Sequence, residues 1–135
     1  MKKFVFFLLM VFAVFACTPD DEIKFEPFSL PIESVVIPDN WTLNEVGFIT
    51  LTYTRPTSCD LFNGFNYQYT NEFIRTVSIE AIRLKETNCT DESQVDYQVD
   101  LKFQPVKVGI YHFRFWSGVD ENGNNTFLEY DVDVQ

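Results

Sequence analysis

Histidine and the sequence motifs of enzymes are almost absent from this chain. It has one histidine, His112, and contains neither a G-x-S-x-G nor an H-E-x-x-H motif. Those motifs carry the nucleophile of many serine hydrolases and the zinc site of many metalloproteases. The 20 acidic residues are spread along the sequence, as surface charges usually are. We therefore expect a protein that is not an enzyme and needs no cofactor, with a hydrolase as the least favoured alternative.

Basic residues are also scarce. Lys and Arg together number 10 against 20 Asp and Glu, which gives a net charge of −10 at pH 7. Nucleic acid is bound through basic patches that neutralise its phosphates, so we expect no nucleic-acid partner. Phe, Tyr and Trp nevertheless supply 17% of the residues, too many for a disordered acidic tail. The composition indicates one folded domain.

No apolar run is long enough to span a membrane. The longest covers residues 4–16, thirteen residues that would reach about 20 Å as a helix, against about 30 Å of hydrocarbon. Lys2 and Lys3 precede this run, and the small residue Ala16 ends it. A basic start, an apolar stretch and a small residue before the cleavage point define a secretory signal peptide. Residues 1–16 are predicted to be that peptide.

The next residues resemble the signature of an exported lipoprotein. Val14-Phe15-Ala16-Cys17 resembles the bacterial lipobox, which implies that Cys17 is acylated and begins the mature protein. The acidic run Asp20-Asp21-Glu22 resembles the export signal of Bacteroidota lipoproteins. These resemblances imply that acyl chains such as palmitate anchor the protein in the outer membrane, at the cell surface or on the periplasmic face. A plain secreted protein is the alternative. Loss of Lys2 and Lys3 would leave 8 basic residues against 20 acidic ones, a net charge of −12.

Cysteine is limited to three residues, and lipid on Cys17 would leave Cys59 and Cys89. Export places these two in a compartment where disulfides persist, so we predict a bond between them. Closing a loop of about 30 residues should stabilise the fold by roughly 3 to 4 kcal/mol. A metal or redox pair would require C-x-x-C spacing or nearby histidine, and the sequence has neither.

Several stretches alternate apolar and polar residues with a period of two, which is typical of half-buried β-strands. They cover residues 34–37, 49–54, 65–69, 73–84, 95–103, 111–115 and 128–134. A change of phase after Ala81 indicates a β-bulge in the fourth of these stretches. About seven strands predict an all-β fold, a single antiparallel two-sheet sandwich over residues 32–135. Residues 17–31, which hold three prolines, are predicted to be the lipidated cysteine and an acidic linker.

The segment Gly109-Ile110-Tyr111-His112-Phe113 resembles the G-x-Y-x-C tyrosine corner of immunoglobulin-like domains. The resemblance implies that the Tyr111 hydroxyl bonds to the backbone of the preceding loop. Phe113 stands where that family has its core cysteine, and Leu51 or Tyr53 would face it. We therefore expect apolar packing in place of the disulfide that joins the sheets in the family.

The last two strands are predicted to form a hairpin with a defined register. The preferred register brings opposite charges together on the outer face. Its pairs are Arg114 with Glu129, His112 with Asp131, and Trp116 with Phe127 outside, and Phe113 with Tyr130 inside. Asp120, Asn122 and Asn124 in the connecting loop alternate like calcium ligands and form a weak metal candidate. Gly123 lies one place too early for an EF-hand, and an Asn-Gly turn explains the same residues.

Aromatic side chains at strand ends or on outward faces are the best candidates for ligand binding. The candidate residues, with the charged neighbours of Trp116, are Trp41, Phe62, Tyr69, His112, Arg114 and Trp116. The alternative is that these rings cap the core. We expect a non-catalytic binding or scaffolding module at the cell envelope. A glycan- or ligand-binding module predicts Trp41 and Trp116 on one exposed patch, whereas a structural subunit predicts an uncovered edge strand or a flat apolar face for an envelope protein partner.

Overall fold

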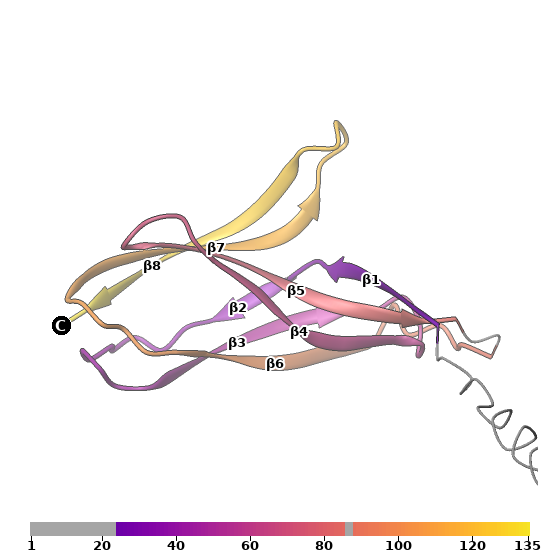
Figure 1. The fold of residues 1–135 in the computed structure, drawn as a ribbon, viewed down its shortest axis with the longest axis horizontal. Coiled ribbons are helices and arrows are strands. Elements are labelled where there is room, and N and C mark those ends of the chain that lie inside the picture. Colours follow the sequence, from indigo (N-terminus) through magenta and orange to yellow (C-terminus); the bar gives the residue numbers. More distant parts are fainter. Residues whose placement is uncertain (1–23, 86–87) are drawn as a thin grey trace, which may run out of the picture.

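A computed structural model describes residues 24–85 and 88–135, and the ordered elements in those two ranges are all β-strands. The strands are β1 (Phe25–Leu30), β2 (Ser34–Val36), β3 (Gly47–Thr54), β4 (Asp60–Tyr69), β5 (Ile74–Leu84), β6 (Asp96–Phe103), β7 (Gly109–Val119) and β8 (Asn125–Val134) (Figure 1). No helix in this part of the chain is long and apolar enough to cross a membrane. The predicted signal peptide and Cys17 lie outside the described residues.

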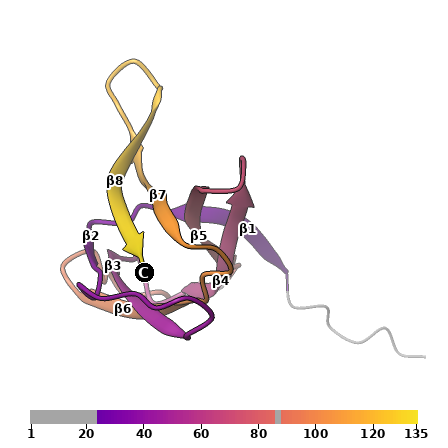
Figure 2. The ribbon, with the colours of Figure 1, turned by 90° about the vertical axis from the view of Figure 1, so that its left-hand side faces the viewer.

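The strands form two sheets, of five and three strands (Figure 2). In the larger sheet β5 is central: β4 pairs with it along one edge, and the other edge is shared by β7 and β1, with β8 outside β7. The smaller sheet has the order β2-β3-β6. The predicted all-β, two-sheet architecture is confirmed, but there are eight strands and one parallel pair, β5 with β7. These two strands run the same way because the chain crosses to the other sheet through β6 between them.

The strand that sequence reasoning missed is β1. Its residues were expected to lie in the linker over residues 17–31, yet they pair with β5 from Phe25 opposite Leu84 to Leu30 opposite Ile79. Pro27 lies opposite Ile82, and β1 is paired along one side only, where a missing N–H is tolerated. Leu30 at its end is buried. The folded domain thus includes residues N-terminal to position 32.

The core lies between the sheets and is rich in aromatic rings. Phe113 is fully buried, and its ring centroid lies 5.0 Å from that of Phe103 and 5.6 Å from that of Phe115. Leu51 and Tyr53 are buried in the same cluster. Apolar packing therefore occupies the position of Phe113, as the sequence predicted.

The hydrogen bond expected of the tyrosine corner is present. The backbone N–H of Lys107 donates to the Tyr111 hydroxyl at 3.1 Å, and Tyr111 is 1% exposed. This bond ties the loop that precedes β7 to the core.

The predicted register of the β7–β8 hairpin is confirmed at all four pairs. The expectation that Tyr130 lies inside with Phe113 is wrong, because Tyr130 is 37% exposed. The far half of the hairpin rises away from the other strands, so the smaller sheet does not cover it (Figure 1). A bulge between Trp116 and Gly118 marks the point where this half begins.

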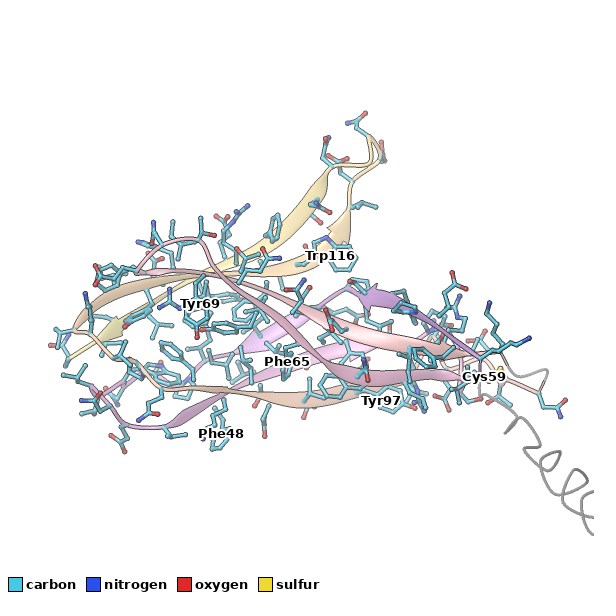
Figure 3. All side chains as sticks on the ribbon, in the orientation of Figure 1. Phe48, Cys59, Phe65, Tyr69, Tyr97 and Trp116 are labelled. Atoms are coloured by element: carbon cyan, nitrogen blue, oxygen red, sulfur yellow. A yellow bond between two sulfur atoms is a disulfide. The ribbon has the colours of Figure 1, made fainter. Side chains whose placement is uncertain are left out.

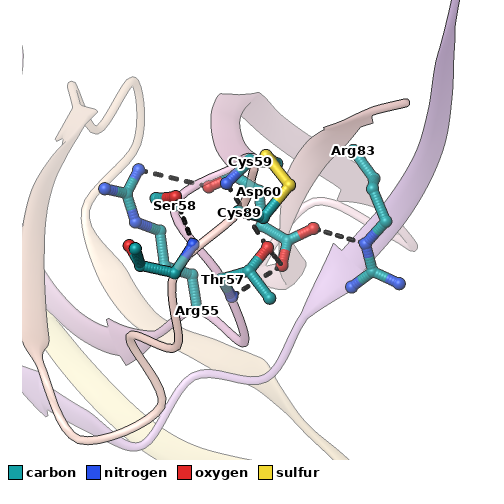
Figure 4. The surroundings of a disulfide bond; sticks show 8 residues. Arg55, Thr57, Ser58, Cys59, Asp60, Arg83 and Cys89 are labelled. Atoms are coloured by element: carbon teal, nitrogen blue, oxygen red, sulfur yellow. Dashed lines mark hydrogen bonds and ion pairs between the residues drawn. A yellow bond between two sulfur atoms is a disulfide. The ribbon is translucent and has the colours of Figure 1, made fainter. Parts of the chain in front are cut away.

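The predicted disulfide between Cys59 and Cys89 is present, with the two Cα atoms 5.4 Å apart (Figure 4). Beside it lies Asp60, whose side chain is fully buried. Its carboxylate accepts hydrogen bonds from the Thr57 N–H at 2.8 Å, the Thr57 hydroxyl at 2.9 Å and Arg83 Nε at 2.5 Å. The disulfide and this carboxylate together hold the start of β4.

Asp60 should make the free energy of unfolding of the domain depend on pH. Burial by itself would raise the pKa of Asp60, but the hydrogen bonds from Arg83 and Thr57 outweigh burial and lower it. A carboxyl whose pKa is lower in the folded state stabilises the fold fully above its ordinary pKa, and this contribution is lost progressively as the pH falls from that value through the lower pKa of the folded state. We expect Asp60→Asn to destabilise the protein by about 2 to 3 kcal/mol at pH 7, and by less at pH 3.

Urea unfolding at the two pH values measures this difference. The matched control is Asp39→Asn, which changes an exposed loop carboxyl. Equal losses of stability at pH 7 and pH 3 for Asp60→Asn would contradict the assignment.

Candidate functional site

A groove of about 560 Å³ opens between β4 of the larger sheet and β6 of the smaller one. Each of these strands is paired along one side only among the residues that the structure describes. The volume lies in the range of small-molecule sites. The groove is lined by Phe65, Tyr67, Tyr69, Arg75, Leu101, Lys102, Phe103, Gln104, Val106 and Tyr111.

The aromatic wall of the groove comes from alternate residues of β4. Phe65, Tyr67 and Tyr69 follow each other with a period of two and therefore point to the same face of the strand. Figure 3 labels the first and the last of these side chains. A bulge between Phe62 and Gly64 shifts the phase of β4, and Gly64 permits it with φ +128°. A bulge was expected in the stretch 73–84, which contains β5, but the extra residue lies in β4, the strand that pairs with β5 there.

Arg75 is a buried cation in this groove. It is 4% exposed and continues the inward phase of Val77 and Ile79 on β5. Its Nη1 donates to the carbonyls of Asn71 at 2.9 Å and Ile74 at 3.1 Å, and its Nη2 donates to the carbonyl of Glu72 at 2.8 Å. The Nε atom is buried and has no hydrogen-bond partner among the described residues.

The charged guanidinium of Arg75 lies against the faces of aromatic rings and not against a carboxylate. The Arg75 guanidinium carbon lies 4.4 Å from the ring centroid of Tyr69 and 5.1 Å from that of Tyr111. Burial raises the pKa of Tyr67, and the nearby charge of Arg75 only partly opposes that effect. Tyr67 is therefore protonated at neutral pH. The groove combines one buried cation, hydroxyl groups and apolar ring faces.

Trp41 is a core residue and not part of an exposed patch. It is 5% exposed, its ring centroid lies 5.2 Å from that of Phe103, and its Nε1 donates to the Pro38 carbonyl at 2.9 Å. The close approach of its ring to Gly47 leaves no room for a Cβ atom at that position. The exposed patch of Trp41 and Trp116 that a glycan- or ligand-binding module predicted is therefore absent, and such a module would have to use other residues. Trp41 instead caps the core, which was the alternative role expected for the candidate aromatic rings.

The other candidate residues are divided between two places. Tyr69 is 71% exposed and lines the groove, whereas Phe62 is 39% exposed and packs on Phe65 and Tyr53 outside the lining. His112, Arg114 and Trp116 lie on the outer face of β7, away from the groove lining.

The outer face of β7 is occupied by cross-strand pairs with β8. His112 Nδ1 lies 2.5 Å from an Asp131 oxygen, and Arg114 Nε lies 3.1 Å from a Glu129 oxygen. Trp116 Nε1 donates to the Asn125 side chain at 2.9 Å. The three side chains therefore belong to a row of cross-strand pairs along the hairpin, in which each has a partner on β8.

The loop of the weak metal candidate is a turn closed by its own hydrogen bonds. The Asp120 carboxylate accepts the N–H groups of Asn122 and Asn124, both at 2.8 Å. The bond from Asn124 N–H is the main cause of a lowered pKa of Asp120. Gly123 has φ +81° and donates to the Asp120 carbonyl at 3.0 Å, which is the geometry of a three-residue hairpin loop. In the described ranges, no group of three or more His, Cys, Asp or Glu could hold a metal ion.

Sequence reasoning did not identify the groove. Phe65 and Tyr67 belonged to a predicted strand, but their position opposite β6 depends on how the sheets pack. The signal that could have been used is Arg75, because a charged residue two places before Val77 continues an otherwise apolar alternation. Comparisons of the chain with protein-family models, curated proteins and solved structures found no match.

Proposed function

We propose that this chain is a lipid-anchored cell-envelope lipoprotein whose immunoglobulin-like domain is a non-catalytic module that binds glycans in the groove between β4 and β6. The observation that carries the proposal is the aromatic wall of Phe65, Tyr67 and Tyr69 in a groove of ligand size. Sugar rings present apolar C–H faces that stack on such side chains, and their hydroxyl groups can bond to the tyrosine hydroxyls.

The tyrosine corner supports the immunoglobulin-like assignment of the proposal. Tyr111 makes the backbone bond that the family resemblance implies. The parallel pairing of β5 and β7 is the feature that separates this sheet from the purely antiparallel sheets of that family.

A glycan array that contains neutral and acidic oligosaccharides tests the binding role. We expect the full-length protein to bind at least one class of glycan, and Tyr69→Ser to weaken binding at least fivefold. Phe48→Ser is the matched control, because Phe48 is 54% exposed but does not line the groove (Figure 3). The glycan role is rejected if no glycan is bound, or if both variants bind as the unchanged protein does.

The anchor is tested by Cys17→Ser. We expect the unchanged protein to fractionate with membranes and to incorporate labelled palmitate, because several acyl chains hold a protein on a bilayer far better than one. The variant should lose both properties. Membrane attachment or label that persists in Cys17→Ser would exclude lipidation at this residue.

A structural subunit of an envelope assembly is the second candidate. It is favoured by the unpaired sides of β4 and β6, which leave backbone N–H and C=O groups available to a strand from another protein. A complex purified from envelopes that retains full affinity with Tyr69→Ser would support this role over glycan binding.

A further inference from the structure

We propose that the groove binds a sugar that carries a single carboxylate, of the uronic acid class, and that Arg75 holds this carboxylate. The inference rests on the proposed glycan-binding role and specifies the ligand of the same site. Arg75, Lys102 and the tyrosine rings of the groove carry it.

The first argument is the state of the Arg75 charge. A buried ion is costly unless another charge and hydrogen bonds compensate it. Arg75 is 4% exposed, yet in the described part of the chain it forms no ion pair, and its Nε donates to nothing. Three backbone carbonyls hold the guanidinium in place without neutralising it. An anion that reaches Arg75 would supply the missing compensation.

The second argument is the distribution of charge around the groove. The chain has twice as many acidic as basic residues, but the groove lining includes Arg75 and Lys102 and no Asp or Glu. The nearby carboxylate of Glu72 pairs with Lys107 rather than with Arg75. The groove is therefore a locally positive site on a strongly negative protein, which favours an anionic ligand there.

The third argument concerns the shape of the ligand. A guanidinium is planar and matches the geometry of a carboxylate. The rings of Tyr67 and Tyr69 line the same groove, where the flat face of a sugar can stack next to the charge. The large negative charge of the protein opposes the approach of a polyanion, so a ligand with one carboxylate is favoured.

Access to Arg75 depends on Tyr69. The Tyr69 ring lies over the guanidinium, and the Nε atom is buried. Because Tyr69 is 71% exposed, its side chain can rotate away without breaking a packed core. The ring would then stack on the sugar instead of on the cation.

Titration calorimetry with matched ligands tests the inference on the full-length protein. The probes are the methyl glycosides of glucuronic, galacturonic and mannuronic acid, each compared with its uncharged methyl ester. We expect at least one acid to bind tenfold or more tightly than its ester. Arg75→Gln should remove that preference, and raised salt should reduce it.

Two further variants keep the test decisive if Arg75→Gln does not fold, since Arg75 also holds three carbonyls. Lys102→Gln changes an exposed residue on the rim and should weaken binding of the acid about threefold without affecting the ester. Lys85→Gln, an exposed lysine that does not line the groove, should change neither.

The possible failures are distinguishable. Equal binding of acid and ester, with loss in Tyr69→Ser, would overturn the role of Arg75 and leave the glycan-binding proposal intact. If the protein bound neutral glycans on the array but none of the acids, the role of Arg75 would likewise be overturned and the glycan-binding proposal would stand. Absence of binding to every glycan would overturn both.

Discussion

Replacement of Phe113 by alanine is expected to lower the free energy of unfolding by about 3 to 5 kcal/mol. Phe113 is fully buried, and it contacts the rings of Phe103 from the opposite sheet and Phe115 from its own strand. Truncation removes the apolar surface that these rings cover and leaves a cavity that neighbouring strands cannot close. The loss is comparable to the whole stability of many small domains, so the variant should be partly unfolded at 37 °C or fail to accumulate.

Urea or guanidinium unfolding of purified protein measures this loss. Phe113→Leu tests how much of the loss comes from the buried volume and how much from the aromatic ring itself. The leucine variant retains most of the buried carbon and should lose less than half as much stability. Phe48→Ala is the surface control, because Phe48 is 54% exposed on β3, and it should change stability by less than about 1 kcal/mol. A loss below about 1 kcal/mol for Phe113→Ala would show that this residue is not central to the core.

Loss of the disulfide is expected to destabilise the domain by about 3 to 4 kcal/mol. Cys59 and Cys89 are 30 residues apart in the sequence, so the bond restricts a long loop in the unfolded chain. It also joins the start of β4 to the segment that leads to β6, on opposite sheets, next to the buried carboxylate of Asp60. The double variant Cys59→Ala/Cys89→Ala removes the bond without leaving a reactive thiol at either position.

The midpoint of denaturant unfolding should fall in the double variant and in the reduced unchanged protein by similar amounts. Cys17→Ser is the matched control, since it removes a cysteine and keeps the cross-link, and its midpoint should not change. If the double variant unfolded at the same denaturant concentration as the oxidised protein, the bond would have no role in stability.

Local patterns in the sequence were enough to predict the strands and one pairing in detail. Alternation with a period of two identified seven of the eight strands, because a strand that is buried on one face must alternate. The register of β7 with β8 followed from the opposite charges of Arg114 and Glu129 and from the complementary pair His112 and Asp131. The disulfide could be predicted because the expectation of export, with lipid on Cys17, left one pair of cysteines.

Contacts between distant segments could not be predicted in the same way. β1 was missed because the three prolines of residues 17–31, one of which is Pro27 within β1, indicate a linker, and only its pairing with β5 makes it a strand. Trp41 was expected at the surface because nothing in its neighbours shows that Phe103 packs against it. Tyr130 was expected inside because it pairs with the buried Phe113, but it lies on β8, the outer strand of the larger sheet, and is 37% exposed.

The sequence by itself determined the all-β class, the hydrogen bond of Tyr111 to the preceding loop and the cysteine pair, since each depends on neighbouring residues or on composition. The tertiary structure alone decided the two-sheet order, the parallel pairing of β5 with β7 and the groove. A groove between sheet edges is formed by residues far apart in the chain, such as Tyr67, Arg75 and Phe103. Arg75 depends on both the sequence and the fold. In the sequence it is a charged residue within an apolar alternation. In the fold, aromatic rings surround its charge, and no carboxylate is among the groove-lining residues.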